Sequence, residues 1–213
     1  MDAAELHDIS VAFAAGTPEW PGDTPFTCGW ASDMTQGASV NVSKWETSPH
    51  VGTHADAPLH VMRDGAGADA LPISAFVGPA TVVDVAEVDG AIPLAVLRAA
   101  GWRPGAERLV LRTHRSTASG QFPDAWPALE RAAAQALMRD GLRLLAVDCP
   151  SVDARESKDL AVHHEVFGGG GYVLENLDLR GVEPGEYELL AFPLKVGVCD
   201  AAPVRAFLRR ATP

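Results

Sequence analysis

The stretch "PALERAAAQALMRDGLRLLAVDCP", residues 127–150, decides the fold class. Its first part has apolar residues at helical spacing between Pro127 and Gly141, which are typical of a helix start and stop, so we expect a helix over 127–140. Its second part, 142–150, is an apolar run with the length of a buried strand. A helix followed directly by a buried strand predicts an α/β fold.

The same alternation continues in both directions along the chain. Apolar and β-branched runs predict further strands at 80–88, 108–114, 172–177 and 186–196. Helical spacing predicts two short helices, at 93–101 and 202–210. Because no change in composition marks a linker, we expect a single domain over residues 1–213.

The first sixty residues differ from the rest of the chain. They are rich in Gly, Pro, Thr and Ser, and they hold only short strand-like pieces such as 38–45. We interpret them as loops laid over a sheet. Loops of this kind often carry binding and catalytic residues.

The overall charge and the cysteines exclude several classes of protein. The chain has 17 Lys and Arg against 28 Asp and Glu, a net charge of -11, and no basic stripe, so we expect no nucleic-acid partner. The distant cysteines Cys28, Cys149 and Cys199 argue against a disulfide framework, and we expect them to be buried thiols. Because no apolar stretch approaches the roughly 20 residues of a membrane span, we expect a soluble, cytoplasmic protein.

The strongest functional signal is "HVGTHADAPLH", residues 50–60, which places His50, His54, Asp56 and His60 within eleven residues. Any one of these histidines could be a loop residue that hydrogen-bonds to the backbone. Four such side chains so close together favour a metal site instead. Imidazole and carboxylate donors without a thiolate suit Zn²⁺, with Mn²⁺ or Fe²⁺ as alternatives.

We expect this segment to be extended rather than helical. Gly52 in its middle and the restriction that Pro58 imposes on the preceding residue both oppose a helix. In an extended chain, residues two apart point to the same side, so His54 and Asp56 can converge. A turn at Gly52 can then bring His50 back to the same point.

A second signal lies in "HHEVFGGGGYVLEN", residues 163–176. His163 and His164 precede four glycines, and Glu175 follows within an apolar strand. An apolar strand has little reason to hold an acid unless a partner pairs with it. The alternative is that Glu175 faces solvent on an edge strand and that the two histidines cap a helix.

Three stretches together resemble the cyclase family of metal-dependent hydrolases, and within it the formamidase branch. They are "SPHVGTHADAPLH" (48–60), "VDCPSVDARESKDLAVHHEVFGGGGYVLENL" (147–177) and "YELLAFPLKVGVCDAAPVRAFL" (187–208). Near the N-terminus, "PEWPGDTPF" (18–26) is similar to the formamidase branch in particular. The resemblance implies a mixed β-sheet core with flanking helices, the swivelling β/β/α-like fold of the family.

The resemblance also implies a reaction and a cofactor. The formamidase branch hydrolyses aryl formamides, so the expected small-molecule substrate is N-formylkynurenine from tryptophan degradation. The family pattern implies two divalent metal ions, usually zinc. Carried over residue by residue, His50, His54 and Asp56 would hold one ion. Asp56 would bridge to the second ion, which His163 and Glu175 would complete.

Further roles follow from the same resemblance. His163 is chosen over His164 because its spacing of twelve residues to Glu175 matches the family. His60 would be the catalytic acid and base, and Trp20 would line the substrate pocket. The family further implies a homodimer with its active sites near the subunit contact.

Two other functions fit the metal motif. One is a cyclase-family hydrolase that opens a cyclic amide or lactone, and the other is a non-catalytic protein that keeps a metal for stability. His60 argues against the second, because it lies beyond the first three ligands of the motif and could exchange a proton.

Overall fold

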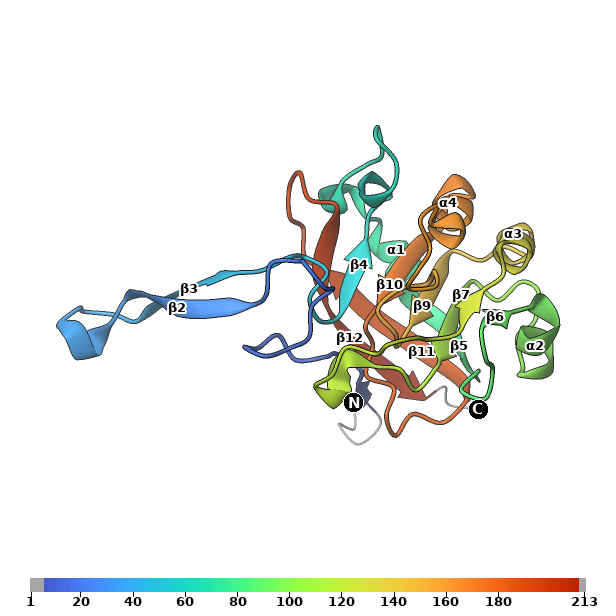
Figure 1. Ribbon diagram of the computed structural model, residues 1–213, viewed down its shortest axis with the longest axis horizontal. Coiled ribbons are helices and arrows are strands. Elements are labelled where there is room, and N and C mark those ends of the chain that lie inside the picture. The colour runs from blue at the N-terminus through green and yellow to red at the C-terminus, as the bar shows by residue number, and fades with distance from the viewer. Residues whose placement is uncertain (1–5, 211–213) are drawn as a thin grey trace.

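A mixed, eight-stranded β-sheet forms the centre of the computed structural model, which describes residues 6–210 (Figure 1). In spatial order its strands are β1 (Leu6–Asp8), β12 (Ala201–Arg210), β11 (Gly185–Pro193), β5 (Val77–Asp84), β7 (Arg108–Arg112), β9 (Leu144–Val147), β10 (Tyr172–Glu175) and β4 (His54–Asp56). Neighbours among β5, β7, β9 and β10 are parallel, and the other pairs are antiparallel. β12 also pairs with β4, so the sheet closes on itself. The predicted α/β fold with a mixed sheet core is confirmed.

Helices cover one side of this sheet. They are α2 (Leu94–Ala99), α3 (Arg131–Arg139) and α4 (Ala161–Gly168), which lie side by side in Figure 1. The single turn α1 (Ile73–Phe76) packs against β5 and β11 instead. The remaining short elements are the paired strands β6 (Ala91–Ile92) and β8 (Ala128–Leu129) and the 3-10 turns η2 (Met34–Gln36), η3 (Pro58–His60), η4 (Ala68–Ala70) and η5 (Thr117–Ser119).

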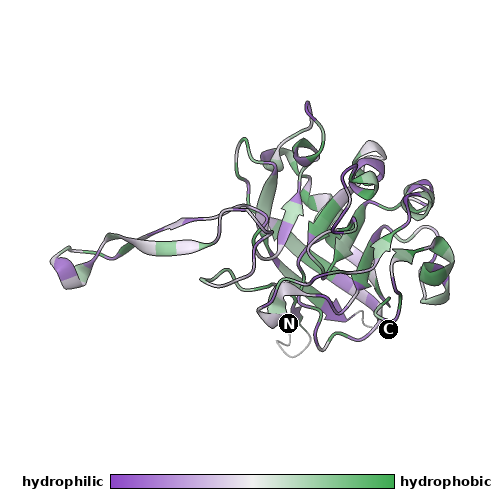
Figure 2. Cartoon of the chain, viewed as in Figure 1, coloured by the Kyte–Doolittle hydropathy of each residue, from purple (hydrophilic) through white to green (hydrophobic). Residues whose placement is uncertain are grey.

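The strands bury alternate residues on the two faces of the sheet, as the two-residue period of a strand requires. On the face covered by α2, α3 and α4, Val83 and Leu111 belong to one buried cluster with Leu137 of α3. On the opposite face, Val82 and Val110 belong to a second buried cluster. Figure 2 shows that the strands of the sheet are predominantly hydrophobic. These two cores fix the strands on which the candidate site is built.

The predicted helix over 127–140 forms, but it begins later than expected, at Arg131. Ala128–Leu129 pairs with Ala91–Ile92 as a parallel strand, which holds the chain extended before the helix can start. The predicted helix over 93–101 is confirmed as α2. The strands expected from the apolar runs are likewise confirmed as β5, β7, β9, β10 and β11, with boundaries that differ by a few residues.

The predicted C-terminal helix over 202–210 is wrong, because this segment is strand β12. Its buried side chains recur at every second residue, at Ala202, Val204, Ala206 and Leu208. Alanine, leucine and arginine are good helix formers, but helix propensity differs by less than about 1 kcal/mol per residue, and burial of one strand face against the sheet outweighs it.

Two expectations from the composition meet different outcomes. Cys149 is buried as expected, whereas Cys28 is exposed and Cys199 is partly exposed, so the prediction of three buried thiols is wrong. Within the part of the chain that the structure describes, no helix is long and apolar enough to cross a membrane.

The hairpin of β2 (Thr27–Ser32) and β3 (Val42–Glu46) projects away from the sheet (Figure 1). We name residues 27–46 the arm. The strand-like piece expected at 38–45 overlaps β3, but the expectation that the first sixty residues lie over the sheet is wrong for the arm. At the base of the arm, the Trp45 ring contacts those of Phe13 and Phe26. The arm exposes five large apolar side chains, which are Trp30, Met34, Val40, Val42 and Trp45.

Candidate metal centre

The segment 50–60 enters the sheet as strand β4. Gly52 precedes the strand with a left-handed φ of 66°, and a Cβ at this position would approach the Phe13 ring to 2.9 Å, so glycine is required. In β4, His54 and Asp56 are 1% and 0% exposed. They lie on the same face of the strand, as their spacing predicts, with His54 Nε2 3.3 Å from Asp56 Oδ1.

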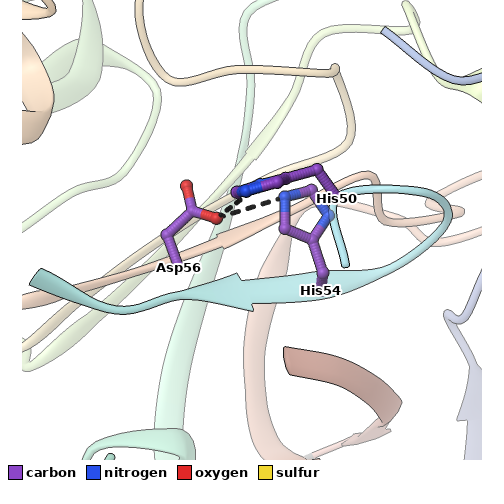
Figure 3. A group of neighbouring side chains, drawn as sticks. All are labelled: His50, His54 and Asp56. Carbon is purple, nitrogen blue, oxygen red and sulfur yellow. Dashed lines mark ion pairs between the residues drawn. The ribbon is translucent and has the colours of Figure 1, made fainter. Parts of the chain in front are cut away.

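The turn at Gly52 returns His50 to the same point (Figure 3). His50 Nδ1 lies 3.1 Å from Asp56 Oδ1, so one carboxylate oxygen faces two imidazoles. His54 Nδ1 lies 2.9 Å from the carbonyl oxygen of Gly52. Because a carbonyl only accepts hydrogen bonds, Nδ1 of His54 carries the proton and Nε2 is left facing Asp56.

His163 reaches the same carboxylate from helix α4, 107 residues further along the chain. Its Nε2 lies 3.1 Å from Asp56 Oδ2. Its Nδ1 lies 2.7 Å from Asp153, whose carboxylate also accepts from the backbone N–H groups of Val162 and His163. Asp153 therefore accepts hydrogen bonds from the free backbone N–H groups at the start of α4, and the same carboxylate orients the His163 imidazole. The adjacent His164 is exposed.

Glu175 joins the group from strand β10, where it stands opposite His54 in the neighbouring strand β4. Glu175 is 3% exposed, which excludes the alternative of an acid facing solvent on an edge strand. Its Oε1 accepts from the backbone N–H of Val152 and lies 3.4 Å from His163 Nε2. Its Oε2 lies 3.6 Å from His54 Nε2. The structure thus brings together His50, His54, Asp56, His163 and Glu175.

Two atoms at the centre of this group fit a metal ion better than a hydrogen bond. His54 Nε2 and Asp56 Oδ1 are buried and lack a hydrogen-bond partner, which typically costs about 1–3 kcal/mol for a polar group. The two oxygens of Asp56 face different donors, Oδ1 towards His50 and His54 and Oδ2 towards His163. Three imidazoles and two carboxylates around a shared oxygen pair are a donor set that suits divalent transition metals.

The buried charges shift the pKa values of the group. Burial lowers the pKa of His50 and His54, but the charge of Asp56 and hydrogen bonds to the surrounding carboxylates together outweigh it and raise the two pKa values to about 10 and about 9. Burial likewise opposes protonation of His163, whose pKa is nevertheless raised by hydrogen bonds with Asp153 and Asp56. Without metal, these imidazoles are therefore protonated at neutral pH. A metal ion that binds them must displace their protons.

His60 lies at the edge of the group, in turn η3. Its Nδ1 is 3.1 Å from Asp200 Oδ2, and His50 Nε2 is 3.0 Å from the same oxygen. These hydrogen bonds hold the pKa of the Asp200 carboxyl well below its usual range. A ring nitrogen of His60 also lies within 4.8 Å of ligand atoms of Asp56 and His163.

A cavity of about 670 Å³ opens onto these side chains. Trp20 and Phe122 line it, and their rings meet edge to face with centroids 5.5 Å apart. Trp126 supports Trp20 from behind the cavity wall, with ring centroids 5.9 Å apart. The glycine run 168–171 is not part of the cavity wall, because it packs against Met138 instead.

Sequence reasoning missed two carboxylates of this site. Asp153 lies ten residues before His163 and acts through a loop, so no local spacing could reveal its contact. Asp200 could have been found, because it is a lone acid within the apolar stretch "VGVCDAAPV", 196–204. The same signal identified Glu175.

Comparison with known sequences places this site in a family. Residues 7–154 match the sequence model of the family described as "Putative cyclase". The chain belongs to the Cyclase family. The resemblance inferred from the metal motif is therefore confirmed, and the motif at 50–60 lies within the matched region.

Individual members of the Cyclase family resemble the chain over nearly its whole length. The kynurenine formamidase of Bacillus cytotoxicus is 42% identical over 209 residues, which cover 98% of this chain and 99% of the relative. The kynurenine formamidase of Bacillus thuringiensis is 40% identical over 211 residues, with coverage of 98% and 99%. A solved structure described as a potential metal-dependent hydrolase with cyclase activity matches with a TM-score of 0.81 and 26% identity, covering 98% of both chains.

Proposed function

We propose that the chain is a metal-dependent amidohydrolase that cleaves N-formylkynurenine to kynurenine and formate, a step of tryptophan degradation. The observation that carries this proposal is Asp56, whose two oxygens face separate buried donors at the wall of an aromatic-lined cavity. The relatives that are 40–42% identical to the chain are named kynurenine formamidases, which supports N-formylkynurenine over the other substrates of the family. A reducing cytoplasm is the proposed compartment, where its three unpaired cysteines would stay reduced.

In this proposal two divalent ions occupy the group, zinc by preference and Mn²⁺ or Fe²⁺ as alternatives. His50, His54 and Asp56 would hold one ion, and Asp56, His163 and Glu175 the other. When bound, such ions provide a nucleophilic water at neutral pH and polarise the scissile carbonyl.

His60 carries the proton in the proposed reaction. Its Nδ1 is engaged by Asp200, so its Nε2 is the nitrogen available to exchange a proton with the substrate. An imidazole can take a proton from the attacking water and pass it to the nitrogen of the aryl amine, which leaves more readily when protonated.

Trp20 is the proposed platform for the aromatic ring of the substrate. It lines the cavity and is held in place by edge contacts with Phe122 and Trp126. Stacking of two aromatic rings contributes about 0.5–1.5 kcal/mol beyond the burial of their area. This contact favours an aryl formamide over an aliphatic one of equal size.

We further propose that two copies of the chain form a homodimer through the arm. A two-stranded hairpin alone is marginally stable in water, and a group of exposed apolar side chains marks an interaction surface. Trp30, Met34 and Val40 lie far along the arm and are each more than half exposed, at 58%, 56% and 54%. In a twofold dimer the same surface is buried on both copies at once.

The substrate assignment is tested by formate release. We expect the purified, zinc-loaded protein to release formate from N-formylkynurenine and to lose this activity after exhaustive chelation. A cyclic amide and a lactone serve as comparison substrates. Hydrolysis of either one with no turnover of N-formylkynurenine would leave the family membership intact and overturn the proposed reaction.

A further inference from the structure

Asp200 joins the two histidines at the ends of the metal motif. Its Oδ2 accepts from His50 Nε2 at 3.0 Å and from His60 Nδ1 at 3.1 Å. The backbone fixes its position, because the carbonyl of Asp200 accepts from the N–H of Ala57 at 2.8 Å. Neither the family match, which ends at residue 154, nor the roles implied by the motif include this carboxylate.

The sheet register explains why the carboxylate lies between these two rings. Ala201 of β12 stands opposite Asp56 of β4, so Asp200 is placed beside Ala57, just before η3 turns the chain towards His60. Asp200 is therefore held by the closure of the sheet rather than by a flexible loop. A side chain placed in this way can fix the orientation of both rings.

We propose that Asp200 is a positioning residue that holds His60 in the tautomer and orientation needed for proton transfer. This inference rests on the proposed function. A carboxylate accepts hydrogen bonds and does not donate them when ionised, so it selects the His60 tautomer with the proton on Nδ1. His60 lines the cavity, and its Nε2 atom is then left without the proton and can act as the proton acceptor.

Asp200 acts in this inference through His60 and not as a metal ligand. Its Oδ2 lies at hydrogen-bond distance from two rings, and His50 turns its other nitrogen, Nδ1, towards Asp56. Loss of Asp200 should therefore change proton transfer much more than metal content. Outer partners that orient the imidazoles of a metal site typically contribute 10–100-fold to metal affinity or activity, so zinc content and kcat must be measured together.

The test is a double-mutant cycle between Asp200 and His60 on the zinc-loaded protein. We expect Asp200→Ala to lower kcat for N-formylkynurenine about 10–100-fold with little change in KM or in zinc per chain. Asp200→Asn, which keeps one accepting oxygen, should lose less. In the His60→Ala background, either change should alter kcat by less than about twofold, because the residue through which Asp200 acts is gone. Asp64→Asn removes a charge from an exposed turn after the motif and is the matched control.

Three results would overturn the inference. They are a loss of zinc that parallels the loss of kcat, an effect confined to KM, and a full loss of kcat from Asp200→Ala in the His60→Ala background. Nitrogen-15 chemical shifts of the His60 ring provide a readout other than activity, because they report which nitrogen carries the proton. An unmutated protein with no activity on N-formylkynurenine would instead show that the proposed function has failed.

Discussion

The arm and strand β4 come from the same sixty residues, yet each places its side chains against the usual preference. In β4, His54 and Asp56 are almost completely buried. In the arm, Trp30 and Trp45 are 58% and 54% exposed. Buried charges and exposed apolar groups are both costly unless a partner compensates for them. The partner that we propose therefore differs between the two regions, a metal ion for β4 and a second copy of the chain for the arm.

The two regions also differ in how they are supported. β4 is hydrogen-bonded on both sides, by β10 and by β12, and its donors are oriented by further contacts such as that between His163 and Asp153. Within the described chain, the arm pairs only with itself beyond its base. We therefore expect changes in β4 to affect chemistry and changes in the arm to affect association.

The largest effect is expected from removing the shared carboxylate. Asp56→Ala should lose more than one equivalent of metal and lower kcat by more than roughly 10³-fold, since even indirect partners of a metal site contribute 10–100-fold. Metal analysis and formate release measure both effects. Asp56→Asn preserves the side-chain shape and serves as a second variant if the alanine protein does not fold. Retention of full metal content by both variants would show that Asp56 is not a metal ligand.

A smaller loss is expected at the edge of the same region. His60→Ala should keep most of the metal and lower kcat about 10²–10⁴-fold, the usual contribution of general acid–base catalysis. Measuring both the metal content per chain and kcat distinguishes a role in proton transfer from a role as a metal ligand. If metal and activity disappear together, His60 is a ligand and the assignment of proton transfer is wrong.

A substitution in the arm tests its proposed role in dimer formation. Trp30→Ala should weaken the dimer about 30-fold, since a buried aromatic anchor at an interface is often worth about 2 kcal/mol. Sedimentation at several concentrations measures the dissociation constant. Ser43→Ala, an exposed polar position of the same hairpin, is the matched control. A protein that is monomeric before mutation would contradict the role given to the arm.

The smallest effect is expected in the aromatic wall. Trp20→Ala should raise KM for N-formylkynurenine several-fold and leave kcat and metal content nearly unchanged, because stacking acts on the ground state and the transition state alike. Steady-state kinetics with an aryl and an aliphatic formamide measures the preference. An equal loss for both substrates would show that Trp20 shapes the cavity without stacking on the ring.

The sequence predicts the residues of the candidate metal centre better than it predicts the exposed arm. The spacing of His54 and Asp56, the turn at Gly52 and the isolated acid Glu175 are local patterns with a physical reason, and the structure brings these residues together. Asp153 was missed because its contact with the site depends on the path of a loop. Such contacts are set by tertiary structure and leave no periodicity.

The two largest errors of interpretation concern strands. Residues 202–210 have helix-forming side chains, but their alternating burial is visible only once the sheet partner is known. The alternation around Val40 and Val42 predicts a strand-like piece at 38–45, but the strands of the arm have no buried face within this chain, so the sequence does not show that they project from the sheet. In both cases the missing information lies in the pairing partner and not in the segment.

The most direct test of the central claim, that the buried polar group around β4 is a metal centre, is a calorimetric titration of Zn²⁺ into metal-free protein. Since His50 and His54 have pKa values of about 10 and about 9 without metal, both are protonated at pH 7 and must release protons when the ion binds. Repeating the titration in buffers of different ionisation enthalpy counts these protons. We expect two equivalents of Zn²⁺ to bind, net proton release at pH 7, and an affinity that rises as pH increases towards 9. Absence of binding, or binding without proton release, would contradict it.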